Sequence, residues 1–387
     1  MADAVAAAWF EERAHLTPVD AVGRLARHHT LPTEDRSPAV AEYLAARPPL
    51  PDWVDPALVR AGQRFFEQWG PQIGVALFVA SLPSGYAGAK GAKVLYRTAR
   101  LVTDPRRRVM ETGQMLLHTM CEGGLDVGGA GWHDARRVRL MHAAVRHLVL
   151  TDPKEPWDVA ELGVPANQED LLGTLWTFSL TTLDVLRRSG VRFTRHEAEA
   201  YLHAWEVVGH LVGVGDDLVP LGLDDAEACF AAIRRRQYAA SEEGGVLTSA
   251  LIGLLRDMLP GRVLDGLPAT AIRHYVGNEV ADILGVPRAG WTHRLFAAGR
   301  ILDEAEDAAD DHAHAMRRVS EWMGKLLWRG FLAVEDRGHR APFEMPDHLA
   351  DGWGIRGLAR REEVIDLRDA AASGAATSTS GRRRAGS

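Results

Sequence analysis

The sequence has little cysteine, no long apolar run and no excess of positive charge, and each absence narrows the class of protein. Its 387 residues include two cysteines, Cys121 and Cys229. Two are too few for a disulfide framework or a zinc cluster, which favours a reducing compartment. No stretch reaches the ~18 uninterrupted apolar residues that a membrane span needs. The net charge of -7, with neither half strongly basic, argues against nucleic-acid binding.

The first residues, MADAVAAAWFEERAHL, lack the basic start, apolar run and cleavage site of a secretion signal. With the cysteine usage, this predicts a cytoplasmic protein. The hydrophobic share of 46% is ample for a large core in a chain of this length. The last residues are rich in Ser, Thr and Gly with a basic end, so we predict disorder at 366–387.

Helical signals dominate the rest of the chain, and segments that alternate with period two are few, which predicts an all-α fold. Three starts have good caps: Asp104-Pro105, Asn167, and Thr194 with Glu197 three residues later. Residues 1–50 read as short helices joined by proline-containing turns. Beyond them we predict helices at about 56–69, 73–80, after Ser84, 105–122, 133–150, 168–190, 195–213, 224–237, 246–259, 268–285 and 291–328.

The stretch RVRLMHAAVRH (137–147) places charge and an imidazole on one helix face. Arg139, His142 and Arg146 are spaced i, i+3 and i+7, so they share that face. Two stacked arginines repel each other, so something should offset them. They also disfavour imidazolium, so His142 should be neutral, which is the form that binds metals.

A short glycine-rich loop joins this helix to the one before it, so the two should be antiparallel neighbours. Arg108 and Thr112 are spaced i,i+4 on the earlier helix. Thr112 and His142 each lie about ten residues from the loop, or about 15 Å up the pair. They therefore should be level, facing each other or two sides of one cavity.

Haem b would satisfy this arrangement, because its iron needs an axial imidazole and its two propionates need cations. Two guanidinium groups suit two carboxylates through bidentate pairing. The alternative is that Arg139 and Arg146 pair with acidic residues of a neighbouring helix, while His142 forms a hydrogen bond inside the core.

Three stretches together carry a resemblance to a known family. They are RRRVMETGQMLLHTM, GWHDARRVRLMHAAVRH and EAYLHAWEVVGHLVGVGDDLVP. The chain, over roughly residues 60–290, resembles the rubber oxygenase (latex clearing protein) family, which includes the related oxygenase of mycophenolic acid biosynthesis. The resemblance implies a globin-like helical core with additional N- and C-terminal helices, bound haem b, and O2-dependent attack on an isoprenoid double bond.

The resemblance also implies a role for each residue of the pattern. His142 would be the axial ligand of the haem iron, with Arg139 and Arg146 as the arginines that flank it. Arg108 and Thr112 would take positions in the distal pocket, where O2 is activated. The domains would then be an N-terminal extension at 1–50, a haem-binding oxygenase domain at 51–365 and the tail.

Two positions depart from the rubber-cleaving members. Glu111 stands where those members have a lysine before the distal threonine. Between Glu67 and Asp104 there is no acidic residue, whereas those members carry a catalytic glutamate in this region. This segment offers instead Lys90, Lys93, Tyr96 and Arg97. The chain is therefore expected to act with O2 on a smaller apolar molecule, such as a terpenoid or polyene.

Two other classes of protein remain open. Asp303, Asp307 and Asp311 are spaced i, i+4, i+8, like the aspartate-rich helix with which class I terpene cyclases hold Mg²⁺ on a diphosphate. The third class is a non-catalytic helical protein that holds a lipid.

Four further histidines are interpreted as structural. His118 and His147 are out of register with Thr112 and His142. His203 and His210 are two helical turns apart, too far to share one ion without other ligands.

Overall fold

The computed structural model describes residues 1–16, 20–21, 24–25, 37–98, 105–219, 222–258, 266–288, 317–318, 320–329 and 345–355, without the side chains of 105–108. Its helices are α1 (Ala2–Glu12), α3 (Pro38–Ala45), α4 (Pro56–Ala76), α5 (Leu82–Ala87), α6 (Ala89–Arg97), α8 (Pro105–Met120), α9 (Ala130–Thr151), α10 (Val159–Leu162), α11 (Gln168–Phe178), α12 (Leu180–Arg188), α13 (Arg195–Val212), α14 (Leu223–Gln237), α15 (Glu242–Met258), α16 (Leu267–Val276), α17 (Asn278–Ile283) and α20 (Asp347–Gly352). A π-helical turn, Leu77–Ser81, joins α4 to α5, and a 3-10 turn, Asp216–Leu218, follows α13. No strand occurs in this part of the chain, and the all-α prediction is confirmed.

The helix α4 continues through Pro71, where the sequence predicted a gap between two helices. Proline lacks the N–H that would bond the carbonyl of Glu67, four residues earlier. The indole Nε1 of Trp353 donates to that carbonyl at 2.7 Å. The helix stays continuous because a side chain from far along the chain replaces the missing donor.

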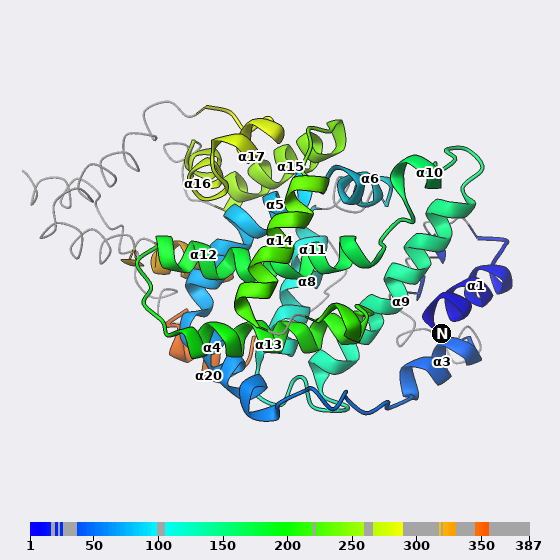
Figure 1. Cartoon of the computed structure of the whole chain (residues 1–387), viewed down its shortest axis with the longest axis horizontal. Helices are drawn as coiled ribbons and strands as arrows, with labels where there is room; N and C mark the ends of the chain where they lie inside the picture. Colours follow the sequence, from blue (N-terminus) through cyan, green and yellow to red (C-terminus); the bar gives the residue numbers. More distant parts are fainter. Residues whose placement is uncertain are drawn as a thin grey trace, which may run out of the picture.

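The centre of the molecule is the contact between α4 and α13, which lie together in Figure 1. A Cβ at Gly62 of α4 would lie 2.3 Å from the carbonyl oxygen of Ala200, so the two backbones touch there. Tyr201 and Trp205 of α13 are buried beside this contact. The helix α13 begins with the predicted capping box of Thr194 and Glu197. Because α13 contacts α4 closely at Gly62, the two helices form a central pair on which other helices pack.

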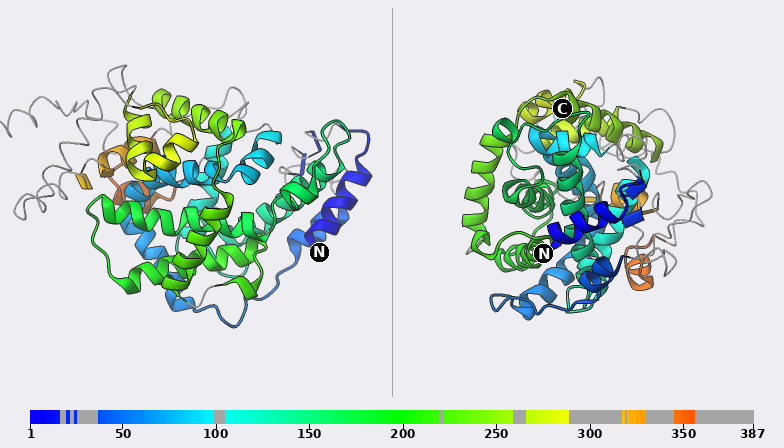
Figure 2. Two further views of the ribbon diagram at one scale, coloured as in Figure 1. Left: turned by 45° about the horizontal axis from the view of Figure 1, so that its top comes forward. Right: turned by 90° about the vertical axis from the view of Figure 1, so that its right-hand side faces the viewer.

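The pair α8 and α9 is held together at the end near its connecting loop. The helix α8 ends at Met120, before the predicted glycine stop, and Gly123 in the loop has a φ of 72°. A Cβ at Gly131 of α9 would lie 2.4 Å from Thr119 Cα. From this contact α9 leans away from α8 and out of the main body (Figures 1 and 2). The helix α1 packs along the outer face of α9 through a second core cluster that includes Trp9 and Leu140.

Two predicted helices are each divided. The stretch 168–190 has the predicted cap at Asn167, but it breaks at Ser179 into α11 and α12. Ser179 Oγ donates to the carbonyl of Leu175 at 3.2 Å, and such back-bonding bends helices. The stretch 268–285 breaks at Gly277, whose φ of 85° suits glycine.

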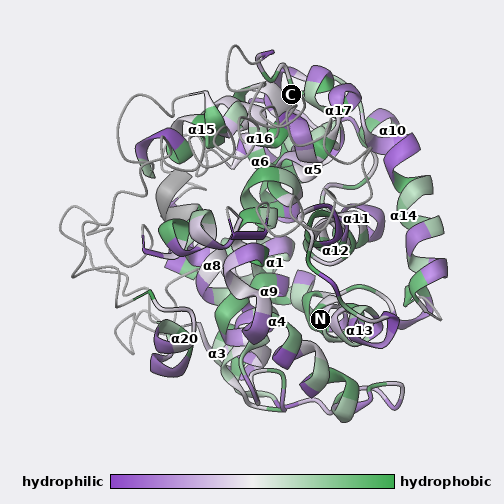
Figure 3. Cartoon of the chain, turned by 90° about the vertical axis from the view of Figure 1, so that its left-hand side faces the viewer, coloured by the Kyte–Doolittle hydropathy of each residue, from purple (hydrophilic) through white to green (hydrophobic). Residues whose placement is uncertain are grey.

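The remaining helices cover this centre. The helix α14 packs on α11 and α13, while α15 and α16 pack on α5. In Figure 3 the hydrophobic positions gather towards the middle and the hydrophilic positions face outward. Among the described helices, none has both the length and the apolar character required to cross a membrane. The predicted helix at 291–328 lies mostly outside the described residues, as do Asp303, Asp307, Asp311 and the tail at 366–387.

Candidate functional site

A cavity of ≈ 150 Å³ lies where α4, α5, α6, α8 and α11 meet. The π-helical turn contributes Leu77 and Phe78 to its wall, and such turns are frequent at functional sites. The helix α6 adds Leu95 and α8 adds Leu116. The wall is therefore mostly hydrocarbon, which suits an apolar occupant.

Thr112 lies in this wall, on the face of α8 that the sequence pattern selected. Arg108 precedes it by four residues on the same helix, but its side chain lies outside the described part of the structure. Glu111 is exposed, as expected for a position about 100° away from Thr112 around the helix. No carboxylate occurs among the described residues that line the cavity, and the hydroxyl groups on it belong to Thr112, Tyr86 and Thr174.

The helix α6, considered above as the source of a replacement for the family glutamate, presents Leu95 to the cavity. Arg97 instead forms an ion pair with Glu155 at 2.8 Å and lies over the Trp157 ring. Tyr96 is 41% exposed. Burial raises the pKa of Asp170 to about 6, and the nearby charge of Lys90 opposes that rise. None of these side chains lines the described cavity wall.

His142 faces the interior from the same side of α9 as three valines. Val138, one turn before it, packs on the main core, and Val145 and Val149, after it, pack against Val94 of α6. The Nδ1 atom of His142 is buried. Val94 precedes Leu95, which lines the cavity, so the face of α9 that bears His142 packs on the same helix, α6, that contributes to the cavity wall.

The contact at Gly131 sets the alignment of α8 with α9. Counted outward from the Gly131–Thr119 contact, His142 is level with Arg108, and Thr112 with Val138. The sequence count placed Thr112 level with His142, one turn away from this alignment. It took the middle of the loop as its origin, whereas the helices touch before α8 ends. Residue 108 of α8, rather than Thr112, is therefore at the same height along the pair as His142.

The two arginines that flank His142 lie along one side of α9, towards the ends of α11 and α13. Arg146 donates to the carbonyls of Pro165 and Ala166 and contacts the Asp3 carboxylate. Arg139 is exposed, and a Cβ at Gly213 would lie 3.1 Å from its Nε. Gly213 ends α13, where a positive charge interacts favourably with the helix dipole. Carbonyls, a carboxylate and a helix end therefore offset the two charges.

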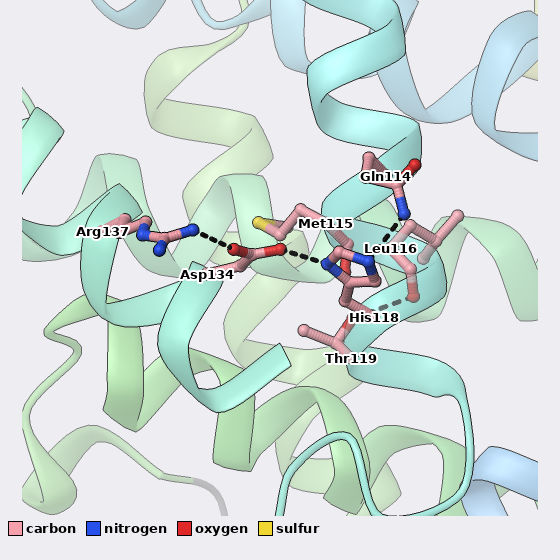
Figure 4. A network of polar contacts seen from close by, with 7 residues as sticks. All are labelled: Gln114, Met115, Leu116, His118, Thr119, Asp134 and Arg137. Atoms are coloured by element: carbon pink, nitrogen blue, oxygen red, sulfur yellow. Dashed lines mark hydrogen bonds and ion pairs between the residues drawn. The ribbon is translucent and has the colours of Figure 1, made fainter. Parts of the chain in front are cut away.

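His118 belongs to a network of polar contacts at the closed end of α8 and α9, shown in Figure 4. Its Nδ1 is 2.6 Å from Asp134 Oδ2, and its Nε2 is 2.7 Å from Gln114 Nε2. Nδ1–H therefore donates to the carboxylate, and Nε2 accepts from the amide. Asp134 also accepts from Arg137 at 3.1 Å. With both nitrogens engaged, His118 has a structural role here, as the sequence predicted.

The other histidines are also engaged. His147 stacks on Phe10 with 4.8 Å between ring centroids. His203 Nε2 accepts from the Asp55 amide at 2.9 Å, and His210 Nδ1 contacts Asp216 at 2.7 Å. In the described residues, no group of three or more His, Cys, Asp or Glu side chains is placed to share a metal ion.

Beside Gly131, burial and the charge of Arg137 lower the pKa of His133 below its ordinary value of 6.5. Protonation of this imidazole is therefore unfavourable in the folded chain.

The described helices and the cavity between them define an all-α protein with a pocket lined mostly by hydrocarbon side chains. Residues 68–305, more than half of the chain, match the family described as "ER-bound oxygenase mpaB/B'/Rubber oxygenase, catalytic domain". The chain belongs to this family and is an oxygenase of it. The resemblance stated from the sequence is thereby confirmed.

The chain is also similar to two known proteins. A protein named "Rubber oxygenase" from Streptomyces sp. (strain K30) is 27% identical over 316 residues, which cover 79% of this chain and 75% of the relative. The solved structure of latex clearing protein LCP in the closed state superimposes with a TM-score of 0.63 at 24% identity, covering 89% of this chain and 93% of that one. The second likeness shows a shared fold.

Proposed function

We propose that the chain is a haem b-dependent oxygenase that acts with O2 on an apolar, unsaturated small molecule of isoprenoid type. The observation that carries this proposal is an apolar cavity that has Thr112 in its wall and shares the helix α6 with the face of α9 that bears His142. The oxygenase family supports it. The domain at 51–365 would carry the site, with 1–50 as an extension, and the cysteine usage supports a cytoplasmic location.

The residue types around His142 suit a haem, since an imidazole stands on an apolar helix face with two arginines on the same helix. The imidazole stands on an apolar interior face with a buried Nδ1, as a ligand protected from water would. Arg146 contacts the Asp3 carboxylate of α1, which is the alternative pairing considered from the sequence, so a haem propionate would take the place of that carboxylate. We therefore assign His142 as the iron ligand and Arg139 and Arg146 as the arginines that hold the cofactor.

Bound haem would supply an iron centre for O2 chemistry. The residues of this chain would provide its surroundings. Leu77, Phe78 and Leu95 would exclude water and hold the hydrocarbon substrate. The Thr112 hydroxyl would donate a hydrogen bond in the cavity, where a dry setting strengthens it. Arg108, level with His142, would supply positive charge at the same site.

The test of the proposal is the absorption spectrum of the purified protein, as isolated and after addition of dithionite. A Soret band that shifts on reduction is the expected result. A colourless protein that does not take up added hemin would overturn the proposal. In a haem-containing protein, O2 uptake is then measured with limonene and with polyisoprene, and we expect the small terpene to be preferred.

Two matched changes in the cavity wall then test the residue assignments. Thr112→Val should keep the haem spectrum and slow O2 uptake with limonene by about a hundredfold, the size of effect that follows loss of one preorganised donor. Thr174→Val changes the other threonine of the wall, at the exposed end of the cavity, and should slow the reaction much less than Thr112→Val. Arg108→Ala should also keep the haem and lose turnover. Equal rates in wild type and Thr112→Val would remove Thr112 from the mechanism.

A further inference from the structure

The cavity has an exposed end and a buried end. Thr174 of α11 lines it and is exposed, whereas Gly74 of α4 and Trp328 line it and are buried. The cavity therefore runs inward from the surface near Thr174 towards Trp328. This tryptophan comes from the helical segment 320–329, far along the chain from the other helices of the wall.

Three contacts fix the indole of Trp328 in place. Its Nε1 donates to the carbonyl of Gly70 at 3.1 Å. A Cβ at Gly74 would lie 2.8 Å from the same nitrogen, so the ring rests on bare backbone. The ring of Trp353 packs against it with 5.4 Å between centroids. Only 3% of Trp328 is exposed, so the buried indole forms part of the inner wall of the cavity.

We infer that Trp328 forms the closed end of the substrate cavity and limits the group that enters it to about one isoprenyl unit. The inference rests on the proposed function and adds the size of the substrate group. An apolar cavity of about 150 Å³ holds a molecule the size of benzene, and the volume here is ≈ 150 Å³. A five-carbon branched group fits this space, and a longer chain would meet the indole.

The lining also determines which end of a substrate enters. Leu77, Phe78 and Leu116 surround the inner part, and burying a polar group among them without a partner is unfavourable. A polar group on the substrate would remain near Thr174, at the exposed end. The substrate is therefore a small molecule with one apolar end that carries the double bond.

The test measures binding of benzene and limonene to the purified protein by isothermal titration calorimetry, without turnover. Wild type should bind benzene. In Trp328→Ala the ratio of the two dissociation constants should shift about tenfold in favour of limonene, because the added space buries its additional carbons. Trp328→Phe keeps an aromatic ring on Gly74 and should shift the ratio in the same direction by less. This second variant preserves the test if Trp328→Ala does not fold.

The matched control is Trp9→Phe. Trp9 is buried in the second core cluster, against α9, and does not line the described cavity. Its ratio of the two dissociation constants should equal that of wild type. An unchanged ratio in folded Trp328→Phe, an equal shift in Trp9→Phe, or no benzene binding to wild type would each overturn the inference.

These outcomes are separate from those of the spectrum. A haem protein whose ratio does not respond to Trp328 would keep the oxygenase proposal and lose the size limit. A colourless protein that shows the shift would overturn the oxygenase proposal and support Trp328 as the end of the cavity.

Discussion

The two ends of the α8–α9 pair differ in how they surround a histidine. At the closed end, Gly131 brings the backbones together, and His118 is bonded on both ring nitrogens by Asp134 and Gln114. At the open end, His142 stands between valines on the face of α9 that packs on α6. In the sequence, each histidine lies three or four residues from polar or charged residues of its own helix, Gln114 for His118 and Arg139 and Arg146 for His142. Their surroundings, rather than their spacing, separate the structural histidine from the candidate ligand.

Removing each histidine in turn tests whether only the open end of the pair supplies the haem ligand, and this change should have the largest effect. His142→Ala should abolish haem binding, because the axial ligand is lost, and the Soret band of the purified protein should disappear. His118→Ala should keep the band, since that imidazole only joins Asp134 to Gln114. A full Soret band in His142→Ala would show that the open end does not supply the ligand.

The next largest effect is expected from the glycine that closes the pair. Gly131→Ala would place a Cβ 2.4 Å from Thr119 Cα, so the backbones must separate. We expect the free energy of unfolding, measured with urea, to fall by about 3 kcal/mol. Gly253→Ala in α15 is the control, because nothing lies within 4 Å of its added Cβ. That change should stabilise the protein by about 0.5 kcal/mol, and a similar loss in both variants would contradict the tight contact.

A smaller effect is expected from the polar network of the closed end. Asp134→Asn removes the carboxylate that joins His118 to Arg137. Because these groups are partly exposed, the loss of unfolding free energy should be about 1 kcal/mol. Asp126→Asn, an exposed position of the connecting loop, should change it by less than about 0.5 kcal/mol. Equal values would mean that the network contributes no stability.

The smallest effect is a pH dependence at the closed end. The pKa of His133 is lowered in the folded chain by burial and by Arg137. The unfolded chain therefore binds more protons just below pH 6.5, and stability falls as the pH falls through that range. In His133→Gln, the difference in urea stability between pH 7.5 and 5.5 should be smaller than in wild type. If the difference in urea stability between the two pH values were the same in wild type and His133→Gln, the lowered pKa of His133 would not be the cause of the pH dependence.

Sequence reasoning succeeded where the deciding contacts are local. The capping boxes at Asn167 and Thr194 start α11 and α13 where predicted, and α8 begins at Pro105. Thr112 lies in the cavity wall because helical periodicity defines its face. Ser179 and Gly277 can be seen in the sequence, but the sequence does not show that the helices divide there. A serine or glycine inside a helix breaks it only when packing favours the bend.

The sequence could not show how the candidate site is closed or aligned. Arg146 contacts Asp3 and the carbonyls of Pro165 and Ala166, and no local pattern connects these groups. Trp328 enters the cavity wall from a segment whose sequence carries no cavity signal.

By itself, the sequence determined the helical class, the main helix starts and the family, because capping bonds, periodic faces and motif spacing involve residues close together in the chain. Only the tertiary structure decided that α4 continues through Pro71, that His142 is level with Arg108, and that an indole closes the cavity. Each of these depends on a close approach between distant segments, such as the 286 residues between Trp353 and Glu67. The packing of the whole core brings such distant segments together. A glycine or a buried indole can form its close contact only when the core holds the partner segment beside it.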